Sequence, residues 1–155
     1  MGRWTDEGYV NGHWGSRGSG VLFVGPGRRI LLLRRSQDIH KPGLWGLPGG
    51  AVPVDRRGRY QEDWTSAKRE VLEEAGYRLR EKPLLVLRNV QDDGFVFTTF
   101  VVLVDKVFPA QLSWEHDDSA WVTRQEAEEL PLHPGIEGLL LLPKMSTLEA
   151  AREVL

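Results

Sequence analysis

Three glutamates lie close together in residues 69–76, REVLEEAG. On a helix, residues three and four positions apart are neighbours, at roughly 5–6 Å between Cβ atoms, so Glu70, Glu73 and Glu74 share one patch. Like charges at this spacing destabilise a helix unless a cation compensates them. Hard divalent ions with oxygen ligands, above all Mg²⁺, suit three carboxylates best. A solvated acidic face with neighbouring basic residues as counter-charges is the alternative interpretation.

The residues around this patch predict one amphipathic helix. Apolar residues recur at helical spacing from Trp64 to Ala75, and Asp63 before them suits an N-cap. Gly76 after them suits a left-handed C-cap. The apolar stripe would pack on a core, and the glutamates would stand on the neighbouring arc of the same helix.

This region resembles the Nudix hydrolases. Their signature runs from a glycine, through a loop, to Arg-Glu-apolar-x-Glu-Glu-x-Gly-apolar, and residues 69–77 match its second half at every fixed position. The lead-in at residues 47–50, LPGG, matches as well. The second half and the lead-in therefore carry the resemblance.

The first half of the signature departs from the family pattern. The family has a glutamate eight residues before the arginine, and that position is Gln61 here, with Glu62 beside it. Gly50 precedes Gln61 by eleven residues where the family has six, so residues 52–58 contain an insertion of five. The family's first glutamate is mainly structural. The replacement therefore bears on loop rigidity more than on metal chemistry, and Glu62 is a candidate substitute after a one-residue shift.

The resemblance implies a site built on the predicted helix. Glu70, Glu73 and Glu74, with Gly50, would hold one to three Mg²⁺ ions, with Mn²⁺ as the alternative metal. Arg69 would orient a glutamate and would not touch substrate. Glu70, Glu73 and Arg69 are accordingly candidate catalytic residues.

A further carboxylate is implied by residues 113–122, SWEHDDSAWV, which look like the family's loop and closing strand. In many Nudix enzymes a carboxylate from this loop reaches the metal cluster or acts as the base. Glu115 is the best match and a candidate catalytic residue, and Asp118 is second. An acidic surface loop is the alternative.

Residues 34–40, RRSQDIH, resemble a segment of the MutT branch, the nucleoside triphosphate pyrophosphohydrolases. In that branch two arginines are followed at the same spacing by Asp-x-His. The match implies that Arg35 contacts a substrate phosphate, which suits its planar fork of donors. Arg34 is a second substrate-binding candidate, and His40 would lie near the nucleotide. Exposed arginines at a strand end are the alternative.

Two pairs of strands are predicted around the helix. The apolar runs 21–24 and 29–34 are joined by the turn residues 25–27, GPG, and the runs 83–87 and 95–104 by a turn at Asp93-Gly94. The runs 21–24 and 29–34 are nearly continuous and the run 95–104 is apolar on both of its faces, which predicts that these three strands are covered on both faces. The resemblance, over roughly residues 21–122, implies an α/β (α+β) protein with the Nudix fold, a mixed curved β-sheet between helices.

Shorter elements are predicted towards the C-terminus. Thr123 with a glutamate three residues later predicts a capped short helix, ended by Pro131. Helical pieces are predicted for residues 136–142 and 147–155.

Composition narrows the class of protein. A length of 155 residues, 41% hydrophobic and 27% charged, predicts one domain over residues 1–155, with residues 1–17 as a loosely ordered arm. The absence of cysteine excludes disulfides and thiolate sites, and no apolar run is long enough for a membrane span. A net charge of −2 without a dense basic tract argues against long nucleic acid as a partner. We expect a cytoplasmic protein, monomeric or homodimeric, with a small nucleotide as partner.

The resemblance implies Mg²⁺-dependent hydrolysis of a nucleoside diphosphate linked to another moiety. A nucleoside triphosphate, in normal or oxidised form, would give the monophosphate and pyrophosphate. ADP-ribose, nucleotide sugars and dinucleoside polyphosphates are alternative substrates. A non-catalytic nucleotide-binding module is a further alternative, because of Gln61 and the extended loop.

Overall fold

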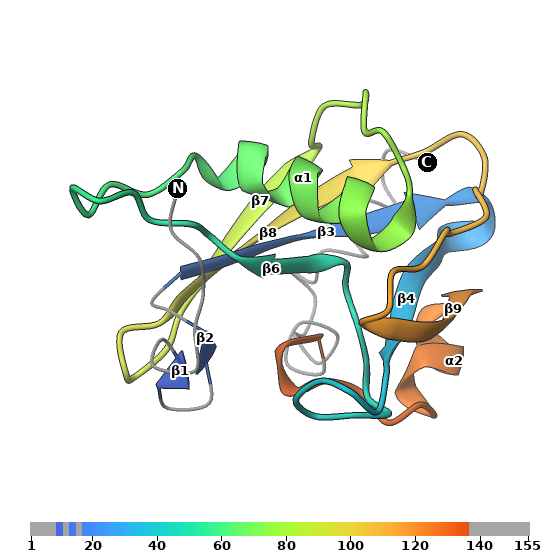
Figure 1. Ribbon diagram of the computed structural model, residues 1–155. Coiled ribbons are helices and arrows are strands. Elements are labelled where there is room, and N and C mark those ends of the chain that lie inside the picture. The colour runs from blue at the N-terminus through green and yellow to red at the C-terminus, as the bar shows by residue number, and fades with distance from the viewer. Residues whose placement is uncertain (1–8, 11–12, 15–16, 137–155) are drawn as a thin grey trace.

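A mixed sheet of seven strands carries the fold, in the order β5-β4-β3-β8-β7, with β6 paired to β3 and β9 paired to β4 (Figure 1). The computed structural model describes residues 9–10, 13–14 and 17–136. β3 and β8 are parallel, and the other pairs are antiparallel. The strands of the sheet are β3 Arg17–Gly25, β4 Arg29–Arg35, β5 Trp45–Gly46, β6 Gly49–Ala51, β7 Leu85–Val90, β8 Val96–Leu103 and β9 His116–Val122.

Two α-helices and several short elements complete the described chain. α1 spans Asp63–Ala75 and α2 spans Arg124–Glu128. A 3-10 turn at Pro26–Arg28 joins β3 to β4, and the short strands β1 Tyr9–Val10 and β2 His13–Trp14 pair with each other. The rest of the predicted arm lies outside the described residues, as do residues 137–155 of the predicted C-terminal helical pieces. No helix in the described part is long and apolar enough to cross a membrane.

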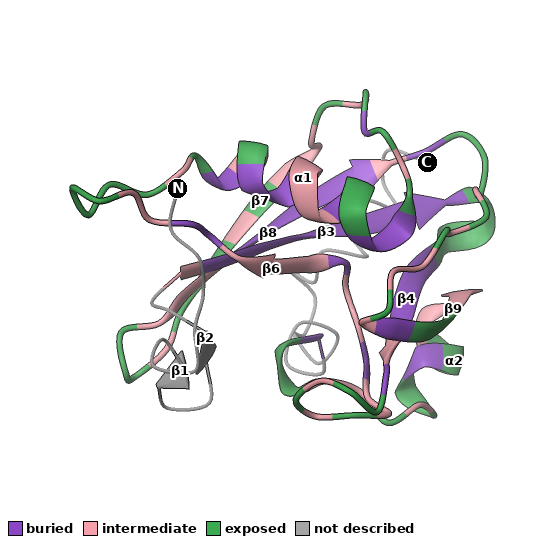
Figure 2. Cartoon of the chain, viewed as in Figure 1, coloured by how far each residue is buried: buried purple, intermediate pink, exposed green. Residues whose placement is uncertain are grey.

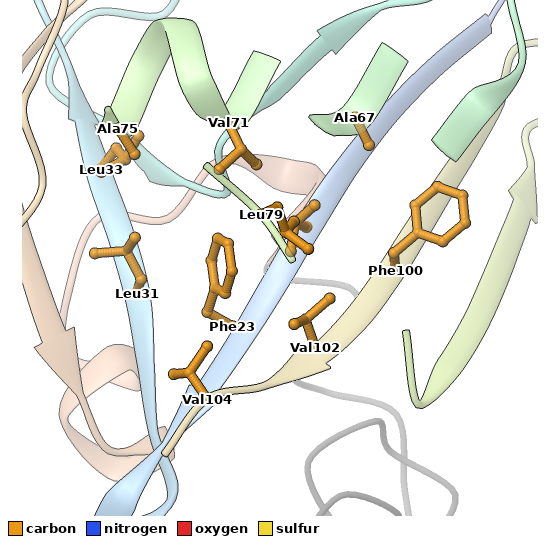
Figure 3. Packing of buried hydrophobic residues seen from close by; sticks show 11 residues of the cluster. Phe23, Leu31, Leu33, Ala67, Val71, Ala75, Leu79, Phe100, Val102 and Val104 are labelled. Atoms are coloured by element: carbon orange, nitrogen blue, oxygen red, sulfur yellow. The ribbon is translucent and has the colours of Figure 1, made fainter. Parts of the chain in front are cut away.

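The centre of the sheet is buried on both faces, as the continuous apolar runs predict. Residues 21–24 of β3 and 30–33 of β4 are at most 1% exposed. Alternate residues enter two cores, because successive side chains of a strand point to opposite faces. One core includes Phe23 of β3 and Val71 of α1 (Figure 3), and the other includes Leu22 of β3 and Ala127 of α2. Figure 2 shows the buried central strands between the two helices. The sheet is therefore sandwiched between α1 and α2, which confirms the predicted fold class.

The C-terminal end of α1 is formed as predicted, and its N-terminal end is not. Gly76 has φ +68°, and its N–H donates to the carbonyl of Leu72 at 3.1 Å. At the other end Glu62 is the N-cap residue, without a side-chain cap bond, and Asp63 is the first residue of the helix. The prediction of Asp63 as N-cap is therefore wrong. Its buried carboxylate instead accepts hydrogen bonds from Arg17, Arg88 and Thr98, which lie on the sheet.

The β7–β8 hairpin follows its predicted turn. Gly94 has φ +88°, and its N–H donates to the carbonyl of Gln91 at 2.9 Å. β8 is largely buried, but β7 is an edge strand on which Val86 is 53% and Val90 is 64% exposed. The coverage of both faces that residues 95–104 predict is therefore present in β8.

The capping box before α2 is present as predicted. Glu126 N donates to Thr123 Oγ1 at 3.2 Å, and Thr123 N donates to Glu126 Oε1 at 2.9 Å. These two bonds satisfy donors that a helix start leaves without intrahelical partners.

We predict that Gly49→Ala is strongly destabilising. A Cβ at position 49 would meet the carbonyl oxygen of Ser19 and lie 2.6 Å from the Cα of Gly20, so β6 would have to move away from β3. Overpacking of this kind costs about 1–3 kcal/mol in the free energy of unfolding, measured by urea denaturation. Gly46→Ala is the control, because its Cβ would meet His133 at an ordinary 3.4 Å. Equal loss of stability in both variants would contradict this account of the β3–β6 contact.

Candidate active site

Two of the three clustered glutamates pack directly on the backbone of β6. Gly49 N donates to Glu74 Oε1 at 2.9 Å, and Glu74 is only 3% exposed. A Cβ at Gly50 would lie 2.8 Å from Glu70 Oε1, so a side chain there would displace that carboxylate. The structure therefore brings Gly50, Glu70 and Glu74 together, although Gly50 and Glu70 are twenty residues apart in the sequence.

The third glutamate has a different environment. The side chain of Glu73 is 57% exposed, whereas that of Glu70 is 14% exposed. On α1 the glutamates therefore form a graded set, from the buried Glu74 through Glu70 to Glu73 at the surface. Such a set offers oxygen ligands that are fixed by packing at one end and accessible from solvent at the other.

Arg69 connects the helix to the loop before it. Its Nη1 donates to Gln61 Oε1 at 2.7 Å, its Nη2 donates to Glu70 Oε1 at 3.2 Å, and its Nε lies 3.7 Å from Glu73 Oε1. Gln61 thus contacts the arginine eight residues later through a neutral amide oxygen. The predicted substitution by Glu62 is wrong, because Glu62 is exposed at the N-cap of α1.

The insertion before Gln61 forms an ordered turn. Val54 and Tyr60 form an isolated β-bridge. Asp55 accepts hydrogen bonds from the backbone N–H groups of Arg57 and Arg59. These bonds, above all the one from Arg59, lower the pKa of Asp55. The extended loop therefore has its own hydrogen-bonded structure and leads into α1 (Figure 1).

The carboxyl groups of the site oppose one another's ionisation. Burial raises the pKa of Glu74 well above its usual value, the neighbouring charge of Glu70 adds to this, and the Gly49 N–H acts in the other direction. Burial also raises the pKa values of Glu70 and Glu115, opposed by Arg69 and Arg35 respectively. A divalent cation would favour the ionised form of each of these groups.

The donor set fits the divalent cations that the resemblance implies, because hard ions prefer carboxylate and carbonyl oxygens. Within the described ranges, however, no three Asp, Glu or His side chains already converge on one point that could hold an ion. Final convergence of the ligands therefore requires rotation of side chains, for which the exposed Glu73 has the most room.

Arg35 and Glu115 join the acidic cluster from β4 and the loop before β9. Arg35 is close enough to lower the pKa values of both Glu74 and Glu115. Its Nε donates to the carbonyl oxygen of His40 at 2.6 Å, and Ser36 N donates to the carbonyl oxygen of Glu115 at 2.8 Å. The bond from Ser36 thus joins the end of β4 to the loop before β9 at the site.

Arg34 lies apart from this cluster, because adjacent residues of a strand point to opposite faces. Its Nε donates to Asp117 Oδ1 at 2.6 Å, and its guanidinium lies 5.7 Å from the centre of the Trp45 ring. Asp118, the second loop carboxylate, lies 3.9 Å from Arg34 Nη1. The side chain of His40 is exposed, and its carbonyl oxygen makes the contact to Arg35.

His116 is a buried group of the site that sequence reasoning did not single out. It is 7% exposed and pairs with Arg35 in the β4–β9 ladder. Burial, with the nearby charge of Arg35, lowers its pKa to about 4, so the ring is neutral near pH 7. Its Nδ1 has no hydrogen-bond partner among the described residues. The sequence pointed to His116 only through its position next to Glu115, because its pairing with Arg35 depends on the strand register, which the sequence does not show.

A family model described as NUDIX domain matches residues 16–141. The chain belongs to the NUDIX domain family. The match covers the acidic helix, both glycines of β6 and the loop with Glu115, and it confirms the membership that residues 69–77 predict. A MutT protein is among the solved structures that share the fold, in agreement with the resemblance to the MutT-like type.

Among curated proteins, the chain is 32% identical over 134 residues to a Mycobacterium tuberculosis protein provisionally named 8-oxo-dGTP diphosphatase 3. The alignment covers 79% of this chain and 59% of that protein, so the chain spans about three-fifths of the length of this relative.

Solved structures share the fold at lower identity. A Caenorhabditis elegans Ap4A hydrolase matches with a TM-score of 0.63 and 21% identity, over 79% of this chain and 92% of that one. A MutT protein from Methanosarcina mazei Go1 matches with a TM-score of 0.63 and 22% identity, over 89% of this chain and 94% of that one.

Proposed function

We propose that this Nudix domain is a Mg²⁺-dependent pyrophosphohydrolase that converts a nucleoside triphosphate, in normal or oxidised form, to the monophosphate and pyrophosphate. The observation that carries the proposal is the packing of Glu70 and Glu74 on Gly49-Gly50, beside Arg35 and Glu115. The name of the M. tuberculosis relative supports an 8-oxo-purine triphosphate as one candidate substrate.

Each residue has a chemical role in this proposal. Glu70, Glu73 and Glu74, with the carbonyl oxygen of Gly50, would hold Mg²⁺ or Mn²⁺. When bound, the ion lowers the pKa of a bound water and offsets the charge of the phosphates. Arg69 positions Glu70 through the 3.2 Å hydrogen bond between them.

The remaining groups act on the substrate and on the attacking water. Arg35 binds a phosphate through its guanidinium. Glu115, whose pKa is raised by burial, accepts a proton from the attacking water. The oxygen of that water bonds to phosphorus while the phosphoanhydride bond breaks. Neither Arg34 nor the His40 side chain has a role here, because Arg34 pairs with Asp117 and the His40 side chain is exposed.

A non-catalytic binding module is the alternative from another functional class. Its main support in the sequence is the replacement of a family glutamate by Gln61 together with the extended loop. Gln61 keeps the contact to Arg69, and the loop is ordered by hydrogen bonds. Both features are therefore compatible with an active site, and we favour the enzyme.

The function is tested with a nucleotide panel in the presence of Mg²⁺. The panel holds dGTP, 8-oxo-dGTP, ATP, Ap4A, ADP-ribose and a nucleotide sugar, with product identification and ¹⁸O-labelled water to locate the attacked phosphorus. We expect the fastest turnover with a nucleoside triphosphate and pyrophosphate as a product. Faster turnover of Ap4A or ADP-ribose would mean that nucleoside triphosphates are not the preferred substrate class. The absence of turnover with any compound would favour the binding module.

We predict that Glu73→Gln and Glu74→Gln each lower kcat at least about 100-fold while the fold is retained, because each removes a charged metal ligand without changing side-chain volume. Mg²⁺ should also raise the Tm of the wild type more than that of Glu74→Gln, since an ion stabilises only a state that binds it. Glu128→Gln on α2 is the matched control and should match the wild type. Full activity of both site variants would rule out the metal-ligand assignment.

We predict that Arg35→Ala raises KM about tenfold or more, with a smaller change in kcat, because a charge-assisted hydrogen bond to phosphate contributes about 1.5–3 kcal/mol. Arg34→Ala is the neighbouring control and should leave KM within about twofold, since Arg34 is held by Asp117. Steady-state kinetics with the best substrate of the panel show which of the two arginines binds the phosphate. A larger KM effect from Arg34→Ala would reverse the assignment.

A further inference from the structure

A second pocket lies at the N-terminal end of α1, away from the acidic cluster. It has a volume of about 390 Å³, within the range of small-molecule sites. Its wall is formed by residues 60–62 before α1, by α1 itself and by β3, β7 and β8, and none of the four glutamates of the candidate active site lines it. The lining residues used below are Arg17, Tyr60, Trp64, Arg88 and Phe100.

Two guanidinium groups in this pocket share one carboxylate oxygen. Arg17 Nη2 and Arg88 Nη2 lie 3.1 Å and 3.4 Å from Asp63 Oδ2, which also accepts from Thr98 Oγ1 at 3.0 Å. Each guanidinium carries five N–H groups and uses one nitrogen for Asp63. The side chains of Arg17 and Arg88 are 30% and 57% exposed, so donors of both remain accessible from the pocket.

Flat side chains lie beside these two cations. The guanidinium of Arg17 lies 4.8 Å from the centre of the Tyr60 ring. Trp64 packs against Phe100 at 4.9 Å between ring centres, and Lys68 Nζ lies 5.6 Å from the Trp64 ring. Aromatic rings and guanidinium planes are the surfaces on which nucleobases stack, at about 1–3 kcal/mol per base.

The charges around the pocket favour an anion. Asp63 is already engaged by three donors, and Glu62, the other carboxylate of the lining, is exposed to solvent. The lining holds two arginines and two carboxylates, and Lys68 beside Trp64 adds a third cation at its edge. A ligand that combines a flat ring with a phosphate would use both kinds of surface, because guanidinium groups bind phosphate through paired N–H donors.

We propose that this pocket is a second ligand site that binds a nucleoside monophosphate, with the phosphate between Arg17 and Arg88 and the base against Tyr60 and Trp64. The insertion supports the site, because Val54 within residues 52–58 forms a β-bridge with Tyr60. Gln61, the next residue, also lines the pocket and accepts the hydrogen bond from Arg69. A ligand here would thus lie beside the contact that positions Glu70, without using the metal ligands.

Binding is tested by isothermal titration calorimetry with GMP, AMP and UMP in EDTA. Guanosine supplies the ring alone and ribose 5-phosphate the phosphate alone. We expect at least one monophosphate to bind at least tenfold more tightly than either fragment, and Arg88→Gln and Tyr60→Ala each to weaken it at least fivefold. Arg80→Gln, an exposed arginine outside the pocket, and Glu74→Gln should bind like the wild type.

Several outcomes would overturn the proposal. These are no saturable binding of any monophosphate, equal binding in Arg88→Gln and Tyr60→Ala, or loss of binding in Glu74→Gln, which would move the ligand to the acidic cluster. Arg17→Gln is a supporting variant only, because it leaves the buried Asp63 with fewer donors, and its fold is checked by circular dichroism. The assay needs neither metal nor turnover, so its result is independent of the proposed hydrolase activity.

Discussion

The contact between α1 and the two glycines of β6 is the constraint on which the site depends. Glu74 is buried against Gly49 N–H, and the carboxylate of Glu70 lies where a side chain at Gly50 would begin. This close approach depends on the pairing of β6 with β3. At that pairing Gly49 lies so close to the backbone of Ser19 and Gly20 that it has no room for a Cβ. Backbone packing therefore fixes the carboxylate of Glu74, whereas the carboxylates of Glu70 and Glu73 can still rotate.

The site concentrates unfavourable electrostatic energy, because several carboxyl groups lie close together and are partly shielded from water. Burial and mutual repulsion raise the pKa values of Glu70, Glu74 and Glu115, and the cations nearby, Arg69 and Arg35, only partly oppose this. Burial of the apolar side chains in the two cores offsets this unfavourable energy, since the central strands of the sheet are nearly inaccessible to solvent. Carboxyl groups with shifted pKa values are typical of functional sites, since they do not contribute to the packing of an apolar core.

Local signals in the sequence predicted much of the fold. The turn at Gly94, the C-cap at Gly76 and the capping box at Thr123 all depend on residues a few positions apart, and all three are present. The paired apolar runs likewise predicted two strands buried on both faces. Residues 69–77 identified the family because their spacing is itself a local property of one helix.

Contacts between distant segments could not be predicted in this way. Asp63 has a strong local preference for the N-cap, but Arg17 and Thr98, 46 and 35 residues away, draw its carboxylate into the sheet. Arg34 and Arg35 are adjacent and chemically identical, and only the strand geometry sends one to Asp117 and the other to the acidic cluster. Such choices depend on register and packing, which sequence spacing alone does not contain.

Gln61 shows how a departure from a family pattern can preserve the geometry while changing the charge. Its amide oxygen accepts from Arg69 at 2.7 Å, so the loop remains tied to the helix. A neutral acceptor competes less strongly than a carboxylate for the guanidinium, because charge-assisted hydrogen bonds are about twice as strong as neutral ones. Arg69 therefore retains more of its electrostatic interaction for Glu70 and Glu73, the two glutamates of α1 that it contacts directly.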